Sequence, residues 1–140
     1  MGKNKSLKKL SAKNSERLKI PKSVPDINYN SFKPTFSFRH MQYQCDWCLS
    51  KCQRPDKSSF VDTLLRLSQH TWSQISSFSR EALGYEKINR DSLKIKSLPP
   101  ILTPEVNIIG FRFSNSGRMA GFRDNDVFHV IFIDPNHNLW

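Results

Sequence analysis

Apolar and polar residues are most regularly ordered in the C-terminal part of the chain. Three apolar runs, at residues 108–113, 118–122 and 127–133, are separated by two polar segments, at 114–117 and 124–126. The runs are rich in β-branched and aromatic residues, which favour strands, and the separating segments are rich in Ser, Asn, Asp and Gly, which favour hairpin turns. This pattern predicts a three-stranded antiparallel meander over residues 107–140.

Upstream, the hydrophobic period changes twice. Residues 32–43 alternate with a period of two, which predicts a further strand with Phe36 and Phe38 facing inward. A helical stripe follows from Pro55 to about residue 70, and a second, shorter helix is predicted at 72–78.

The sequence between these helices and the meander is less regular. Thr71 is the expected N-cap of the second helix, and Gly84 is expected to adopt left-handed backbone at a helix end. A short strand is predicted at 93–96, before a segment broken by prolines.

This order of elements predicts an α+β fold. We expect an antiparallel sheet of about four strands, made of one N-terminal strand and the C-terminal three-stranded meander, with the helix pair packed on one face. A chain of 140 residues fits one domain. Residues 1–30 are polar and rich in Lys, Ser and Asn, so we expect a flexible basic arm before a single domain at 31–140.

Charge changes the interpretation of the meander. The formal net charge is +10, yet residues 101–140 hold three Lys or Arg against four acids. The positive excess therefore lies in the arm and the middle of the chain, and it favours a polyanion or an acidic protein as partner. No apolar run approaches the roughly 20 residues of a membrane span, and there is no export signal, so we expect a cytoplasmic protein with no membrane association.

The cysteines permit two interpretations. Cys45, Cys48 and Cys52, with His40 upstream, have a spacing that zinc sites can use. All four lie within a short stretch and no second cysteine pair exists, whereas structural zinc usually joins two separated pairs. The spacing therefore favours buried free cysteines, and we expect no metal and no cofactor.

Phosphate-binding glycine loops, HExxH helices and nucleophile elbows are absent. What remains is a group of cationic and titratable residues on the meander: Arg112, Arg118, Arg123, His129 and His137. RNA cleavage needs no more than this, because the 2′-hydroxyl of the RNA is the nucleophile. The protein has to supply an acid, a base and a cation for the scissile phosphate.

The C-terminal segment RMAGFRDNDVFHVIFIDPNHNLW is similar to the ending of the RelE/ParE-like superfamily, the toxins of bacterial type II toxin–antitoxin modules. The resemblance covers about residues 35–140 and implies a RelE-like α+β domain. Carried over by position, it implies that Arg118 and, less directly, Arg112 hold the scissile phosphate and that His137 acts as acid or base. The chain departs from the pattern at Trp140, where the family has Tyr, and in its basic arm.

The resemblance implies a metal-independent endoribonuclease that acts on RNA or ribosome-bound mRNA and is neutralised by a cognate antitoxin protein. Some members of the superfamily instead poison a topoisomerase. The alternative is a non-enzymatic basic module that binds nucleic acid or protein, with or without zinc held by His40, Cys45, Cys48 and Cys52.

Overall fold

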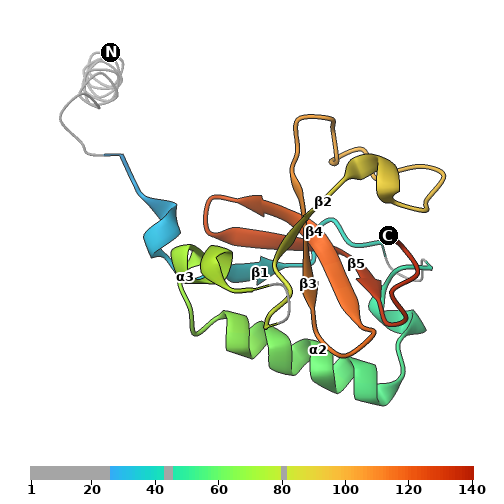
Figure 1. Cartoon of the computed structure of the whole chain (residues 1–140). Coiled ribbons are helices and arrows are strands. Elements are labelled where there is room, and N and C mark those ends of the chain that lie inside the picture. Colours follow the sequence, from blue (N-terminus) through green and yellow to red (C-terminus); the bar gives the residue numbers. More distant parts are fainter. Residues whose placement is uncertain (1–25, 43–45, 80–81) are drawn as a thin grey trace, which may run out of the picture.

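The computed structural model of the protein describes residues 26–42, 46–79 and 82–140. Its centre is a five-stranded mixed sheet with the strand order β1-β5-β4-β3-β2 (Figure 1). The predicted α+β class is therefore confirmed. The strands are β1 (Thr35–Ser37), β2 (Glu86–Ile88), β3 (Ile108–Arg112), β4 (Arg118–Asp124) and β5 (Val127–Asp134); the α-helices of the described residues are α2 (Arg54–Leu67) and α3 (Trp72–Ser77).

The predicted meander is confirmed as β3, β4 and β5. Each strand pairs antiparallel with the next, and the polar segments between them form the turns. Asn125, in the second turn, has a φ of 57°, the left-handed backbone that Asn tolerates better than most residues.

The expectation of four antiparallel strands is wrong in two respects. β1 pairs parallel to β5, with Thr35 opposite Val127. A fifth strand, β2, lies at residues 86–88 and pairs with β3, whereas the predicted strand at 93–96 does not form. In that segment the Lys94 N–H donates to the carbonyl of Leu139, so the backbone there is bonded to the C-terminal residues and not to a strand of the sheet.

The two predicted helices are present and lie on one face of the sheet (Figure 1). Thr71 is the N-cap of α3, as predicted: its hydroxyl accepts from the N–H of Gln74, whose side-chain oxygen accepts from the Thr71 N–H. The inward stripe of α2 is narrower than the sequence indicates, because Val61 and Leu65 are 59% and 62% exposed. Gly84 has the expected positive φ of 69°, but it lies beyond the end of α3.

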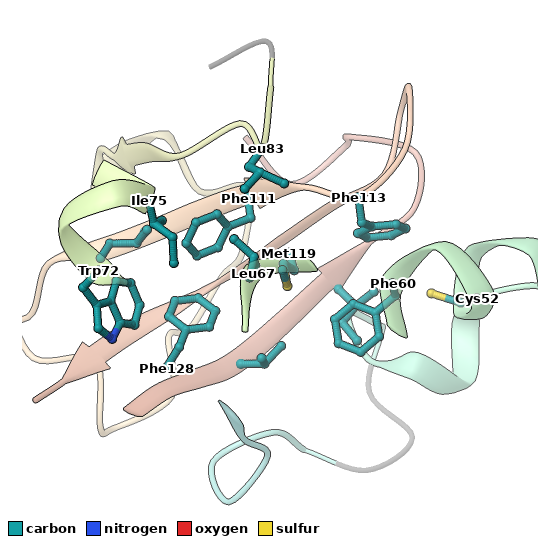
Figure 2. Close-up of a cluster of buried hydrophobic side chains, with 13 residues drawn as sticks. Cys52, Phe60, Leu67, Trp72, Ile75, Leu83, Phe111, Phe113, Met119 and Phe128 are labelled. Atoms are coloured by element: carbon teal, nitrogen blue, oxygen red, sulfur yellow. The ribbon is translucent and has the colours of Figure 1, made fainter. Parts of the chain in front are cut away.

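The helices and the sheet enclose the larger of two hydrophobic cores (Figure 2). Phe60 and Leu67 of α2 and Trp72 and Ile75 of α3 contact the inward side chains of β3, β4 and β5. Phe36 packs against this core as predicted, but Phe38, predicted to face inward, is 48% exposed because β1 ends at Ser37.

A second core covers the opposite face of the sheet. Segment 89–107 and the C-terminal residues lie over it and contribute Leu93, Leu102 and Leu139. Both faces of β4 and β5 are therefore buried, as predicted for β5. No helix in the described ranges has the length and apolar character needed to span a membrane. The predicted arm lies outside the described residues up to position 25.

Candidate functional site

Arg112 and Arg118 are neighbours in the sheet. They are paired across β3 and β4, and Arg118 is paired in turn with Asp134 of β5. Directly opposed residues on neighbouring strands project to the same face. The register therefore places two guanidinium groups and one carboxylate in a row across three strands, next to the turn at 114–117.

Arg118 stabilises that turn. Its side chain is 8% exposed, and its Nη1 donates to the carbonyls of Ser114, Asn115 and Gly117 at 3.2, 3.2 and 2.9 Å. A buried guanidinium needs acceptors to offset its lost hydration, and the turn supplies them. Arg118 therefore positions the β3–β4 turn.

Arg112 is half-buried and is held by its backbone. Its N–H donates to the carbonyl of Leu83 at 3.0 Å, and a Cβ atom at position 84 would lie 2.6 Å from the Arg112 Cβ. Position 84 therefore requires glycine for two reasons: its positive φ and the close approach of Arg112. Within the described residues, the Arg112 Nε is buried without a hydrogen-bond partner. An unpaired buried donor costs about 1–3 kcal/mol, so such a group calls for an explanation.

His137 lies in a turn that folds back to the same end of the sheet. Asp134 Oδ2 accepts from the Leu139 N–H at 2.7 Å, and Ser116 Oγ donates to the Pro135 carbonyl at 2.8 Å. The second bond joins the C-terminal turn to the turn that Arg118 stabilises. His137 itself has a φ of 53°, a left-handed backbone that costs energy for a non-glycine residue.

Trp140 contacts both His137 and the sheet. The two rings make an edge contact with centroids 5.5 Å apart, and the indole N–H donates to Glu86 Oε1 at 2.9 Å. Glycine at position 110 leaves space for the indole, because a Cβ there would lie 3.1 Å from Trp140 Cζ2. Arg112, Arg118 and His137, the three residues predicted from the sequence, thus lie at one end of the sheet.

Arg123 does not join this group. Its guanidinium carbon lies 4.4 Å from the centroid of the Trp72 ring, and its Nε donates to the Asn125 carbonyl at 2.6 Å. Burial lowers the pKa of Arg123. The residue is at the other end of β4 and on the helix-covered face, so the three meander arginines do not form one anion site.

A histidine pair was not predicted from the sequence. His40 and His129 have ring centroids 5.1 Å apart, and His129 stacks on Phe122 at 4.7 Å with an interplanar angle of 16°. Burial lowers the pKa of His129, the His40 imidazole lowers it further, Asp124 raises it and Arg39 lowers it. The pair depends on the parallel pairing of β1 with β5, which places Ser37 opposite His129. The alternation that includes His40 was the available signal, but it does not identify the partner strand.

Of the proposed zinc ligands, Cys45 lies outside the described residues. Cys48 and Cys52 are buried, as favoured from the sequence, and burial raises the pKa of Cys52 to about 11. His40 packs against His129 and Phe122. Over the described ranges, no three His, Cys, Asp or Glu side chains come together in a way that would hold a metal ion.

Comparison of the chain with protein-family models, with curated proteins and with solved structures finds no match.

Proposed function

We propose that the protein is a metal-independent endoribonuclease of the RelE/ParE-like kind, the toxin of a toxin–antitoxin pair. The observation that carries the proposal is the convergence of Arg112, Arg118 and His137 at one end of the sheet. Two of these residues have unusual local features: a buried Nε without a hydrogen-bond partner at Arg112 and left-handed backbone at His137.

The reaction would proceed through the 2′-hydroxyl of the RNA. A base removes its proton, the oxygen attacks the adjacent phosphorus, and the 5′-oxygen of the next nucleotide leaves after accepting a proton. The products are a 2′,3′-cyclic phosphate and a free 5′-hydroxyl. The negative charge on the phosphate oxygens rises during the attack, so a fixed cation lowers the barrier.

Arg112 is suited to the phosphate. Its guanidinium can donate two parallel hydrogen bonds to phosphate oxygens, and its backbone is held against Leu83 and Gly84. Arg118 contributes by holding the adjacent turn, since its Nη1 already donates to three carbonyls.

His137 is suited to the proton transfer, because an imidazole can act as acid or base near neutral pH. Trp140, where the family pattern has Tyr, has no titratable group, and its N–H is bonded to Glu86. His137 therefore serves as acid or base, and water carries the other proton.

The test is cleavage of a single-stranded RNA by the purified full chain in the presence of a chelator. We expect products with 2′,3′-cyclic phosphate ends, and no cleavage where a 2′-deoxynucleotide replaces the attacking residue. His137→Ala should lower the rate by about 10²–10⁴-fold. Arg123→Ala is the matched control, because this arginine lies at the other end of β4 and should leave the rate of the folded protein unchanged.

Two outcomes would contradict the proposal: no cleavage of any RNA, or equal cleavage by wild type and His137→Ala. Binding with a steep salt dependence and no cleavage would instead favour the non-enzymatic nucleic-acid module. The antitoxin is part of the same proposal, and its test is growth arrest on induction that co-expression of the neighbouring gene relieves.

A further inference from the structure

A hollow of about 480 Å³ lies beside β5, beyond the point where β1 stops pairing with it. Its lining is mostly apolar and comes from three parts of the chain, and it includes the polar side chains of Gln42, Ser50 and Lys57. The lining includes Phe38, Met41, Leu49, Ile133, Gln42 and Lys57. This volume is within the range of sites that hold small organic groups.

Phe38 gives the hollow a fixed aromatic wall. Its ring centroid lies 6.2 Å from that of Phe60, which is 1% exposed and makes an edge contact with Phe113. Phe38 is nevertheless 48% exposed. A ring supported by the core on one side and open on the other is the arrangement on which a planar ligand group stacks.

The electrostatics favour an anion. Among the described residues that line the hollow, Lys57 carries the charge, and no carboxylate is present. Ser50 and Cys48 bond to each other at 2.8 Å. The nearby carboxylate of Asp56 accepts from the N–H of Gln53 at the start of α2. Arg39 and Lys51 adjoin lining residues in the sequence, as do Asp56 and Asp134, whose carboxylates accept hydrogen bonds from Gln53 and Leu139.

We propose that this hollow binds one nucleotide of a single-stranded RNA. The base stacks on Phe38, the Gln42 amide bonds to the edge of the base, and Lys57 meets a flanking phosphate. An aromatic platform beside cations is the general solution for binding single strands, because every base has a face that can stack.

The choice of RNA rests on the proposed function. Ile133 lines the hollow and immediately precedes Asp134, which is paired with Arg118. Ile133 and Asp134 project to opposite faces of the sheet, so an RNA that reaches from the hollow to Arg112 has to pass around the end of β5.

Binding can be tested without cleavage. The probe is a fluorescent 2′-O-methyl oligouridine of about eight nucleotides, because its blocked 2′-oxygen cannot attack the phosphate. Anisotropy with the full chain gives its dissociation constant. Phe38→Leu keeps an apolar side chain but removes the stacking face, and it should weaken binding by about 5- to 100-fold. Lys57→Gln should lower the slope of log K against log salt by about 0.7.

Matched controls separate the hollow from general surface effects. Phe32 is 44% exposed and does not line the hollow, so Phe32→Leu should bind as wild type does. Phe38→Trp retains an aromatic face and should bind within about threefold of wild type, which also guards against a folding defect at this position. Circular dichroism confirms that each variant is folded.

The inference is overturned if folded Phe38→Leu binds as wild type does, or if Phe32→Leu weakens binding equally. Either result would leave the hollow to another occupant, such as an apolar side chain of a protein partner. Failure of the proposed chemistry gives a different result: RNA stays intact while oligonucleotide binding still depends on Phe38. Cleavage without Phe38-dependent binding would retain the chemistry and reject the hollow.

Discussion

Asp134 Oδ2 accepts a hydrogen bond from the Leu139 N–H at 2.7 Å, and the Asp134 side chain is 1% exposed. The bond closes the C-terminal turn against the last residue of β5. Because His137 lies inside this turn, one buried carboxylate determines where the proposed acid–base group is held.

Asp134→Ala should destabilise the fold by about 1–3 kcal/mol, since it leaves a buried N–H without an acceptor. Asp134→Asn keeps one acceptor oxygen and should cost less. Urea unfolding measures both changes. Asp62→Asn, an exposed substitution on α2, should shift stability by no more than about 0.5 kcal/mol. Equal stability of wild type and Asp134→Ala would contradict the role assigned to this bond.

Two buried glycines in the meander should respond differently to alanine. At Gly121, a Cβ would overlap the backbone carbonyl oxygen of His129, where β4 and β5 shift register. At Gly110, it would lie 2.8 Å from Ile88 Cδ1, the flexible end of a side chain. Backbone cannot move aside as a side chain can.

We therefore expect Gly121→Ala to cost about 3 kcal/mol or more and Gly110→Ala about 1–2 kcal/mol. Thermal unfolding of the two single variants tests this order. The reverse order would show that the close approach of β5 at Gly121 is misassigned.

Stability should fall as the solution is acidified through the range of histidine titration. Burial and the neighbouring His40 lower the pKa of His129 in the folded protein. The unfolded chain then binds a proton more readily than the folded chain does. The contribution of His129 is complete above its unfolded pKa of about 6.5 and is lost as the pH falls through the folded value.

The measurement is the urea midpoint between about pH 7.5 and 5. His129→Asn should flatten this part of the pH dependence. His40→Asn should reduce the loss only in part, because burial of His129 remains. An unchanged profile in His129→Asn would assign the acid sensitivity to other groups.

Arg118 and Arg112 should separate stability from activity. Arg118→Ala removes the donor to three turn carbonyls and should lower stability by about 2–3 kcal/mol. Arg112→Ala removes an unpaired Nε, so it should lower stability less and cleavage by about 10²–10³-fold. Urea unfolding and single-turnover cleavage of the same samples distinguish the two effects. If folded Arg118→Ala loses as much cleavage activity as Arg112→Ala, Arg118 contacts the phosphate directly.

Most elements of this fold could be predicted from local pattern. The meander, its two turns, α2 and α3 all follow from periods of two or 3.6 and from turn and capping residues. β2 was missed because Glu86–Ile88 is only three residues long and carries two charged side chains. It forms a strand because β3 offers an open edge whose backbone groups need partners.

Local pattern likewise predicts one part of the candidate site and not the rest. Arg112 and Arg118 could be predicted as neighbours, because the length of the turn in a hairpin determines which residues of its two strands lie opposite each other. The burial of Arg118 under turn carbonyls depends on side-chain packing that no local pattern contains. His40 and His129 lie far apart in the sequence and meet through a parallel pairing.

The sequence by itself determined the three strands of the meander and their turns, the two helices, and that the charge excess lies outside the meander. The tertiary structure decided that β1 runs parallel to β5, that Phe38 is left exposed, and that Arg123 is separated from Arg112 and Arg118. The reason is physical. Periodicity reflects the geometry of one element, whereas pairing between distant segments depends on how much apolar surface the whole chain can bury after the loops close.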